Sequence, residues 1–130
     1  MSEAFSYALF RVVPSIARGE AVNVGAIVHC RRRDFLGVAI ELDSERLRAL
    51  DPGLDLEAVA SHLTAIERIA AGDESAGPIA ALDRSERFGA LVAPASTVVQ
   101  ASPVHTGVTD DPAATLERLR AELVAPPAGP

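Results

Sequence analysis

The chain has 130 residues, of which 48% are hydrophobic and 23% charged, so it is long and apolar enough to fold as one domain with its own core. It contains no lysine, so all 12 positive charges are arginine, and 18 acidic residues give a net charge of −6. This composition excludes a phosphate-binding loop or a Schiff base that depends on lysine, and it disfavours general nucleic-acid binding.

Cys30 is the only cysteine, so the chain cannot form an internal disulfide or a zinc site built from several thiolates. A lone thiol fits a reducing compartment. Residues 1–5 include Glu3 and no basic segment, and the longest apolar runs fall far short of the ~20 residues that cross a membrane. We therefore expect a cytoplasmic protein with no signal peptide, no membrane segment, no metal and no cofactor.

The first third of the chain is rich in Val, Ile, Leu and Phe, which favour strands. Three strands are predicted, over residues 7–13, 21–30 and 35–42. Their even-numbered residues form one apolar face, as a half-covered antiparallel meander requires. Directly paired residues share a face, so this pattern requires Cys30 to lie opposite Asp34 or Leu36. Gly25, inside the second strand, indicates a bulge or a close approach of another backbone.

Aspartates mark the start of four predicted helices, because a carboxylate accepts hydrogen bonds from the first free amides of a helix. These N-caps are Asp43, Asp55, Asp83 and Asp111. The first three helices are predicted to end near residues 50, 71 and 92. A fourth strand over residues 96–102 and a loop over residues 103–110 separate the third helix from the last.

This order of elements predicts a two-layer α+β fold. The antiparallel sheet has about four strands, a three-stranded N-terminal meander plus one later strand, and the helices pack on one face. Residues 1–124 form this single domain, and residues 125–130 form a disordered tail. Apolar residues on the odd-numbered face, such as Leu9 and Phe35, need cover from the C-terminal helix or from a second subunit.

The odd-numbered face also carries polar residues. If the strands pair as predicted, Arg11, Asn23 and Glu41 form one row across the meander. Arginine can hold a carboxylate or phosphate with two hydrogen bonds, so the row could bind an anion. The alternative is an ordinary cross-strand ion pair worth under ~1 kcal/mol. The three arginines at residues 31–33 are either a solvated hairpin end or a grip for a phosphate or an acidic partner.

A second candidate site is the predicted loop that follows the fourth strand. Ser102 and His105 could act there as nucleophile and base, with a nearby aspartate as the orienting acid. No oxyanion element or nucleophile elbow accompanies them. The alternative is a structural loop held by hydrogen bonds of His105 and Thr106. His29 and His62 stand apart, without a second ligand at metal-binding spacing.

Several short segments of the chain are distinctive in combination. They are YALFRVVP at residues 7–14, GEAVNVG at residues 19–25, LRALD at residues 47–51, SERF at residues 85–88 and SPVHTG at residues 102–107. Together they resemble the bacterial domain of unknown function 3037 family (DUF3037). The likeness covers residues 7–123, with Ala21 where a large residue is expected. The resemblance implies no established activity.

The resemblance also implies a candidate functional surface, which consists of Arg11, Glu20, Asn23, Arg87, Ser102, His105 and Thr106. Genes of this family sometimes lie beside a kinase of the toxin–antitoxin type, which implies a protein partner. We therefore expect a small accessory or interaction protein that binds a protein partner or itself. The alternative is a small enzyme or binding protein for an anionic, phosphate- or nucleotide-like ligand, which uses arginine and the loop with Ser102 and His105.

Overall fold

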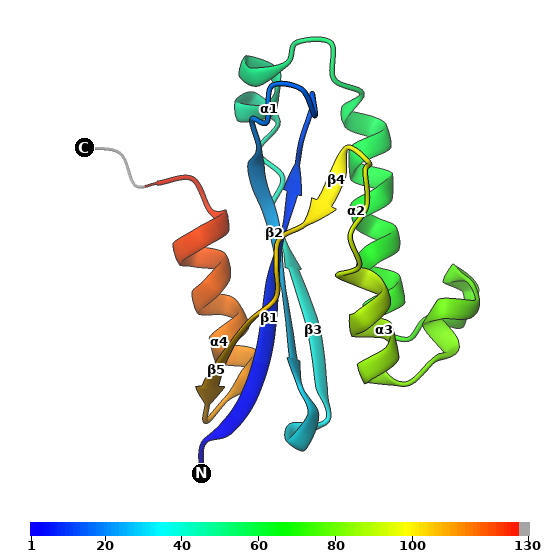
Figure 1. Ribbon diagram of the computed structural model, residues 1–130, viewed down its shortest axis with the longest axis vertical. Helices are drawn as coiled ribbons and strands as arrows, with labels where there is room; N and C mark the ends of the chain where they lie inside the picture. The colour runs from blue at the N-terminus through cyan, green and yellow to red at the C-terminus, as the bar shows by residue number, and fades with distance from the viewer. Residues whose placement is uncertain (128–130) are drawn as a thin grey trace.

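The computed structural model describes residues 1–127, which form an open antiparallel sheet flanked by helices (Figure 1). The strands are β1 (Glu3–Val12), β2 (Val22–Cys30), β3 (Phe35–Ile40), β4 (Val99–Ala101) and β5 (His105–Thr109). The α-helices are α1 (Ser44–Leu50), α2 (Leu56–Ala70), α3 (Arg84–Leu91) and α4 (Pro112–Leu119), and a π-helical turn at Arg120–Val124 continues α4. The predicted α+β class is confirmed. Among the helices of residues 1–127, none has the length and apolar composition that crossing a membrane requires.

The four predicted helix starts are confirmed. Each capping aspartate accepts a hydrogen bond from the backbone N–H three residues later, as the side chains of Asp43, Asp55, Asp83 and Asp111 show. This satisfies amides that have no partner inside the helix. The tail predicted over residues 125–130 is described only in part: residues 125–127 belong to no helix or strand, and residues 128–130 lie outside the described residues.

The predicted N-terminal meander is confirmed, with strand order β3-β2-β1. Both β4 and β5 pair antiparallel with the remaining side of β1, β4 with its C-terminal end and β5 with its N-terminal half. The sheet therefore has five strands instead of about four. The predicted loop over residues 103–110 is wrong for His105–Thr109, which form a strand. The reason is that β1 is long enough to pair with both pieces of this edge. Pro103, which lacks an N–H, separates the two pieces.

Helices cover both faces of the sheet, so the prediction of helices on one face is wrong (Figure 1). The larger core lies between the sheet and α1–α3 and includes Phe10, Leu47 and Leu63. The smaller core lies on the opposite face, where Val28 and Leu119 meet. α4 packs over β2 and β3 there, which is the first of the two covers expected for the apolar odd-numbered face.

A bulge in β2 explains why two apolar faces exist. Phe10 lies opposite Gly25, but Arg11 lies opposite Asn23, so Val24 is an extra residue on β2. Beyond the bulge the alternation of β2 reverses, so the even-numbered residues of this strand face α4. The register predicted between β2 and β3 is therefore wrong by one residue, because Cys30 pairs with Phe35.

Gly25 makes the close approach that the sequence indicates. A Cβ at this position would lie 2.6 Å from Ile40 Cδ1 and 3.2 Å from the carbonyl oxygen of Ala39. Both interpretations of this glycine, a bulge and a close approach, are confirmed.

Candidate functional site

Three polar side chains lie side by side across the middle of the sheet. Arg11 on β1 pairs with Asn23 on β2 and with Gln100 on β4. We call these three residues the Arg11 row. The predicted pairing of Arg11 with Asn23 is confirmed, but Glu41 does not belong to the row. It forms an ion pair with Arg120, which follows α4.

The guanidinium of Arg11 has no acidic partner within residues 1–127. Its Nε atom is buried and has no hydrogen-bond partner in the described part of the chain. The ion pairs of these residues are made by other arginines, Arg18, Arg68, Arg118 and Arg120. The alternative of a cross-strand ion pair at Arg11 is therefore wrong.

The two neighbours of Arg11 have already used donor groups of their side chains. Asn23 Nδ2 donates to the carbonyl oxygen of Leu123 at 3.0 Å, and Gln100 Nε2 donates to that of Thr97 at 2.8 Å. These hydrogen bonds fix both carboxamides on either side of the guanidinium. The row thus presents one positive charge between two neutral groups that are held in place.

Ser102 and His105 have separate positions and do not form a nucleophile–base pair in the structure. Ser102 is buried, and its Oγ accepts a hydrogen bond from the Leu9 N–H at 2.8 Å and donates one to the Pro103 carbonyl oxygen at 2.9 Å. His105 is exposed, and its ring lies 5.2 Å from that of Tyr7. The hydroxyl of Ser102 is therefore occupied by hydrogen bonds to the backbone, while the imidazole of His105 is open to solvent.

The other candidate residues lie elsewhere. Thr106 pairs with Ser6 and is exposed. Glu20 forms an ion pair with Arg18 beside a hollow of about 390 Å³ that the connection between β1 and β2 forms with the end of α1. Of the candidate residues predicted from the sequence, the fold therefore brings only Arg11, Asn23 and His105 to one face of the sheet.

Arg87 of α3 has a structural position on the opposite face from the Arg11 row. It donates to the carbonyl oxygens of Leu82 at 2.6 Å and Ala70 at 3.4 Å, so it fastens the segment between α2 and α3 to the end of α2. Ala70 belongs to the buried face of α2. The sheet therefore separates Arg87 from His105.

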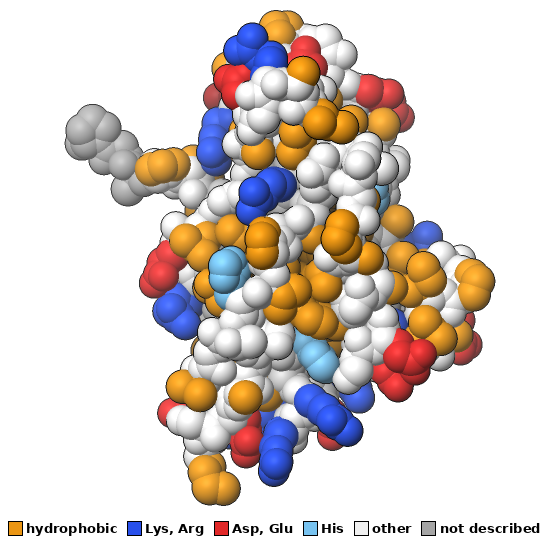
Figure 2. All heavy atoms as spheres, in the orientation of Figure 1, with side chains coloured by type: hydrophobic (Ala, Val, Ile, Leu, Met, Phe, Trp, Pro, Cys, Tyr) orange, Lys and Arg blue, Asp and Glu red, His pale blue; other side chains and the backbone are white. Residues whose placement is uncertain are grey.

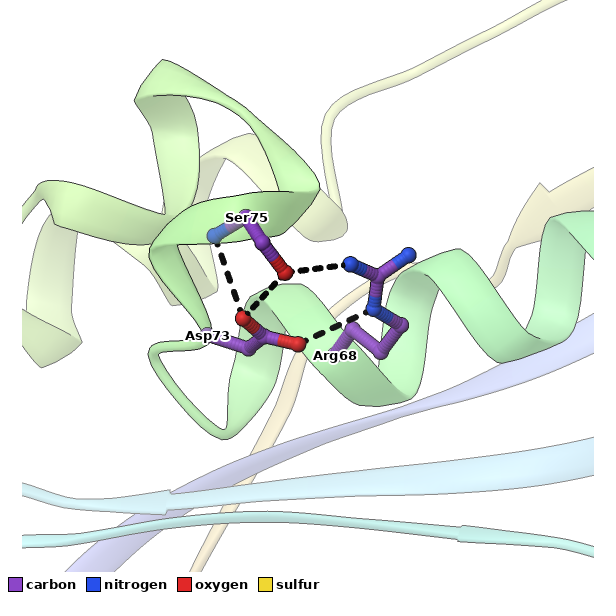
Figure 3. Close-up of polar contacts among 3 residues, drawn as sticks. All are labelled: Arg68, Asp73 and Ser75. Atoms are coloured by element: carbon purple, nitrogen blue, oxygen red, sulfur yellow. Dashed lines mark hydrogen bonds and ion pairs between the residues drawn. The ribbon is translucent and has the colours of Figure 1, made fainter.

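A second cluster supports the same segment (Figure 3). Arg68 near the end of α2 donates to Asp73 at 3.0 Å and to Ser75 at 2.6 Å, and the Ser75 hydroxyl donates to Asp73 at 2.6 Å. Hydrogen bonds from Ser75 and Arg68 lower the pKa of Asp73. This cluster is exposed and closes the turn after α2. Sequence reasoning missed it because the residues carry no spacing signal.

His29 lies where β2 meets α3. Its ring stacks on Phe88 with a centroid distance of 5.1 Å, and its Nε2 lies 3.4 Å from Ser85 Oγ. Burial lowers the pKa of His29, and the positive charge of Arg31 adds to this effect. These contacts hold the imidazole of His29 between β2 and α3.

The outer side of β5 is an open edge of the sheet, because β5 pairs only with β1. Val108 is 72% exposed and Val104 is 44% exposed. Residues 88–109 contain no Asp, Glu, Lys or Arg. Figure 2 shows hydrophobic side chains gathered over the middle of the molecule, where an apolar hollow of about 350 Å³ lies between α2, α3 and β4.

Residues 1–127 contain no group of three or more His, Cys, Asp or Glu side chains that could hold a metal ion. A family model described as "Protein of unknown function (DUF3037)" matches residues 7–124. No curated protein and no solved structure matches the chain.

Proposed function

This chain belongs to the DUF3037 family, a family of unknown function, and we propose that it is a small bacterial cytoplasmic accessory protein that binds another polypeptide along β5. The observation that carries this proposal is the open edge of β5, with the exposed side chain of Val108. An unpaired edge offers a row of backbone donors and acceptors to an extended segment of a partner. Cys30 is a single buried cysteine that forms no disulfide, and this is compatible with a protein of the cytoplasm.

The edge lacks the charged residues that usually prevent such pairing. Soluble proteins protect exposed edges with charged residues, and residues 88–109 contain none. Its protection is limited to Pro103, which separates β4 from β5 and leaves His105–Thr109 free to pair. The bound strand would lie beside exposed Val104 and Val108.

A second copy of the chain is a suitable partner for this edge. Two β5 strands that pair antiparallel about Gly107 bring Thr106 of one chain opposite Val108 of the other. Asp110 then faces Val104 of the other copy, so no carboxylate lies opposite a carboxylate. Self-association is therefore the first binding event to test.

The test compares the mass in solution of the wild-type chain, Val108→Lys and Ile16→Lys across a range of protein concentrations. Ile16 is the matched control, because it is 64% exposed and lies away from the edge. We expect dimers of the wild type and of Ile16→Lys and monomers of Val108→Lys, since a lysine on the edge opposes strand addition.

Affinity capture with the same three chains tests a different partner. A protein bound by the wild type and by Ile16→Lys, but lost from Val108→Lys, supports docking on β5. A wild type that stays monomeric and captures nothing that Val108→Lys loses would overturn the proposal.

A further inference from the structure

We infer that the Arg11 row is a binding site for a carboxylate. The site consists of the Arg11 guanidinium between the carboxamides of Asn23 and Gln100, on the face of the sheet that carries α4. This inference does not depend on the proposed role of β5, because the row lies on other strands and uses other groups.

The first step is the state of the guanidinium. A buried polar group that makes no hydrogen bond is unfavourable, and a charged one more so. Arg11 is half-buried, its Nε is buried without a hydrogen bond, and it forms no ion pair with residues 1–127. Arg87 makes the contrast clear, because its Nε is also unpaired but its two Nη atoms hold backbone carbonyls. The Nη atoms of Arg11 have no such partners within residues 1–127, and they are the groups to which an anion could bind.

The second step is the bulge opposite Arg11. If the register that pairs Phe10 with Gly25 continued unbroken, the apolar Val24 would lie opposite Arg11. The extra residue in β2 puts Asn23 there and turns Val24 into the larger core. Bulges are frequent beside functional sites, where they redirect a side chain. Here the bulge gives Arg11 a polar neighbour.

The third step is the choice of anion. The planar guanidinium matches a carboxylate with two parallel N–H···O hydrogen bonds. A phosphate carries more charge and more acceptor oxygens, which need further donors. Asn23 and Gln100 each donate one of two side-chain N–H groups to a backbone carbonyl, so each has at most one left for an anion. Arg120, on the same face, is held by Glu117 and Glu41, whose hydrogen bonds raise its pKa.

The test observes the Nε–H group of Arg11 by NMR in the full-length chain while an anion is added. The probes are sodium acetate, the capped peptide acetyl-Ala-Glu-Ala-amide, sodium phosphate and sodium chloride at equal ionic strength. We expect a saturable shift of the Arg11 Nε–H signal with acetate or with the peptide. The tighter of these two identifies a free acid or a polypeptide as the source of the carboxylate.

Substitutions provide the control. Arg11→Gln abolishes saturable binding, whereas Arg48→Gln, at an exposed arginine of α1, leaves it unchanged. In buffer without carboxylates, Arg11→Met has a Tm about 2–8 °C above the wild type, because it removes a buried Nε–H group that has no acceptor. A structural role would give a lower Tm. No shift with either carboxylate, tighter binding of phosphate, or a lower Tm of Arg11→Met would each overturn the inference.

Discussion

One hydroxyl group supplies a hydrogen bond to β1 at the gap between β4 and β5. The Ser102 N–H donates to the Leu9 carbonyl oxygen at 2.7 Å, and Ser102 Oγ accepts from the Leu9 N–H at 2.8 Å. Leu9 thereby keeps both of its backbone hydrogen bonds where the edge strand is interrupted. The side chain replaces the backbone acceptor that a continuous strand would provide.

Ser102→Ala removes this acceptor and leaves the Leu9 N–H buried without a partner. We expect it to lower the free energy of unfolding by about 1–3 kcal/mol, measured by urea denaturation. His105→Ala is the matched substitution, because it removes only the exposed ring that contacts Tyr7, and its cost is below about 1 kcal/mol. Equal losses in the two variants would show that Ser102 is not the structural contact.

At the scale of residues, the sequence allowed part of the candidate site to be predicted. Alternation along β1 and β2 predicts that Arg11 lies opposite Asn23, and this is confirmed. Gln100 could not be predicted as the other neighbour, because nothing in a single sequence says which strand a later segment joins. For the same reason the sequence alone did not show that the sheet separates Arg87 from His105.

The bulge in β2 determines how this strand serves two cores. Val24 lies in the larger core, and Val28 lies in the smaller one, although both are even-numbered. The sequence predicts a bulge from Gly25 but does not say which residue is extra. Counting alternation through the strand therefore gave the correct faces before Gly25 and the opposite faces after it. The sequence therefore contained a signal for the bulge, but no signal for the effect of the bulge on the strand register.

Gly25→Ala tests the close approach at this bulge. The added methyl would lie 2.6 Å from Ile40 Cδ1 and 3.2 Å from the Ala39 carbonyl oxygen, so we expect a loss of about 1–3 kcal/mol in unfolding free energy. Gly89→Ala adds the same methyl in α3, where nothing lies within 4 Å, and should gain about 0.5–1 kcal/mol. Thermal melts of both variants measure the difference. A Gly25→Ala protein as stable as wild type would mean that β3 moves aside.

The stability of the whole molecule depends on pH through His29. Burial and the charge of Arg31 lower the pKa of His29 in the folded chain. In the unfolded chain its pKa is about 6.5, so the unfolded state takes up the proton first as pH falls. The contribution of His29 to the free energy of unfolding is therefore complete above about pH 6.5 and is lost as pH falls below this value.

His29→Gln removes this dependence. We expect the wild-type midpoint in urea to fall between about pH 7.5 and about pH 5.5, and the fall to be smaller in His29→Gln. His62→Gln, at an exposed position of α2, is the control and should behave as wild type. The same pH dependence in all three chains would assign the effect to other groups.

At the scale of the molecule, the α+β class and the meander could be predicted because hydrophobic periodicity and helix caps are local signals. For the opposite face, the sequence left two possible covers open, the C-terminal helix and a second subunit, since the position of α4 depends on which face the residues of β2 reach after the bulge. The edge made of β4 and β5 was also missed in part. Residues 103–110 have the composition of a loop, and the length of β1 lets His105–Thr109 of this segment pair as part of the edge.

The pairing of β1 with β4 and β5 also has a consequence for synthesis on the ribosome. Leu9 and Ser102 are separated by 93 positions, so β1 emerges long before its second neighbour exists. At typical rates of about 5–20 residues per second, that interval is roughly 5–20 s. During it, the nascent meander exposes the backbone of β1 on one side. Translational pausing before residue 99 would prolong this exposure, and a neighbouring nascent chain that has already made its β5 could then occupy the place of the missing strand.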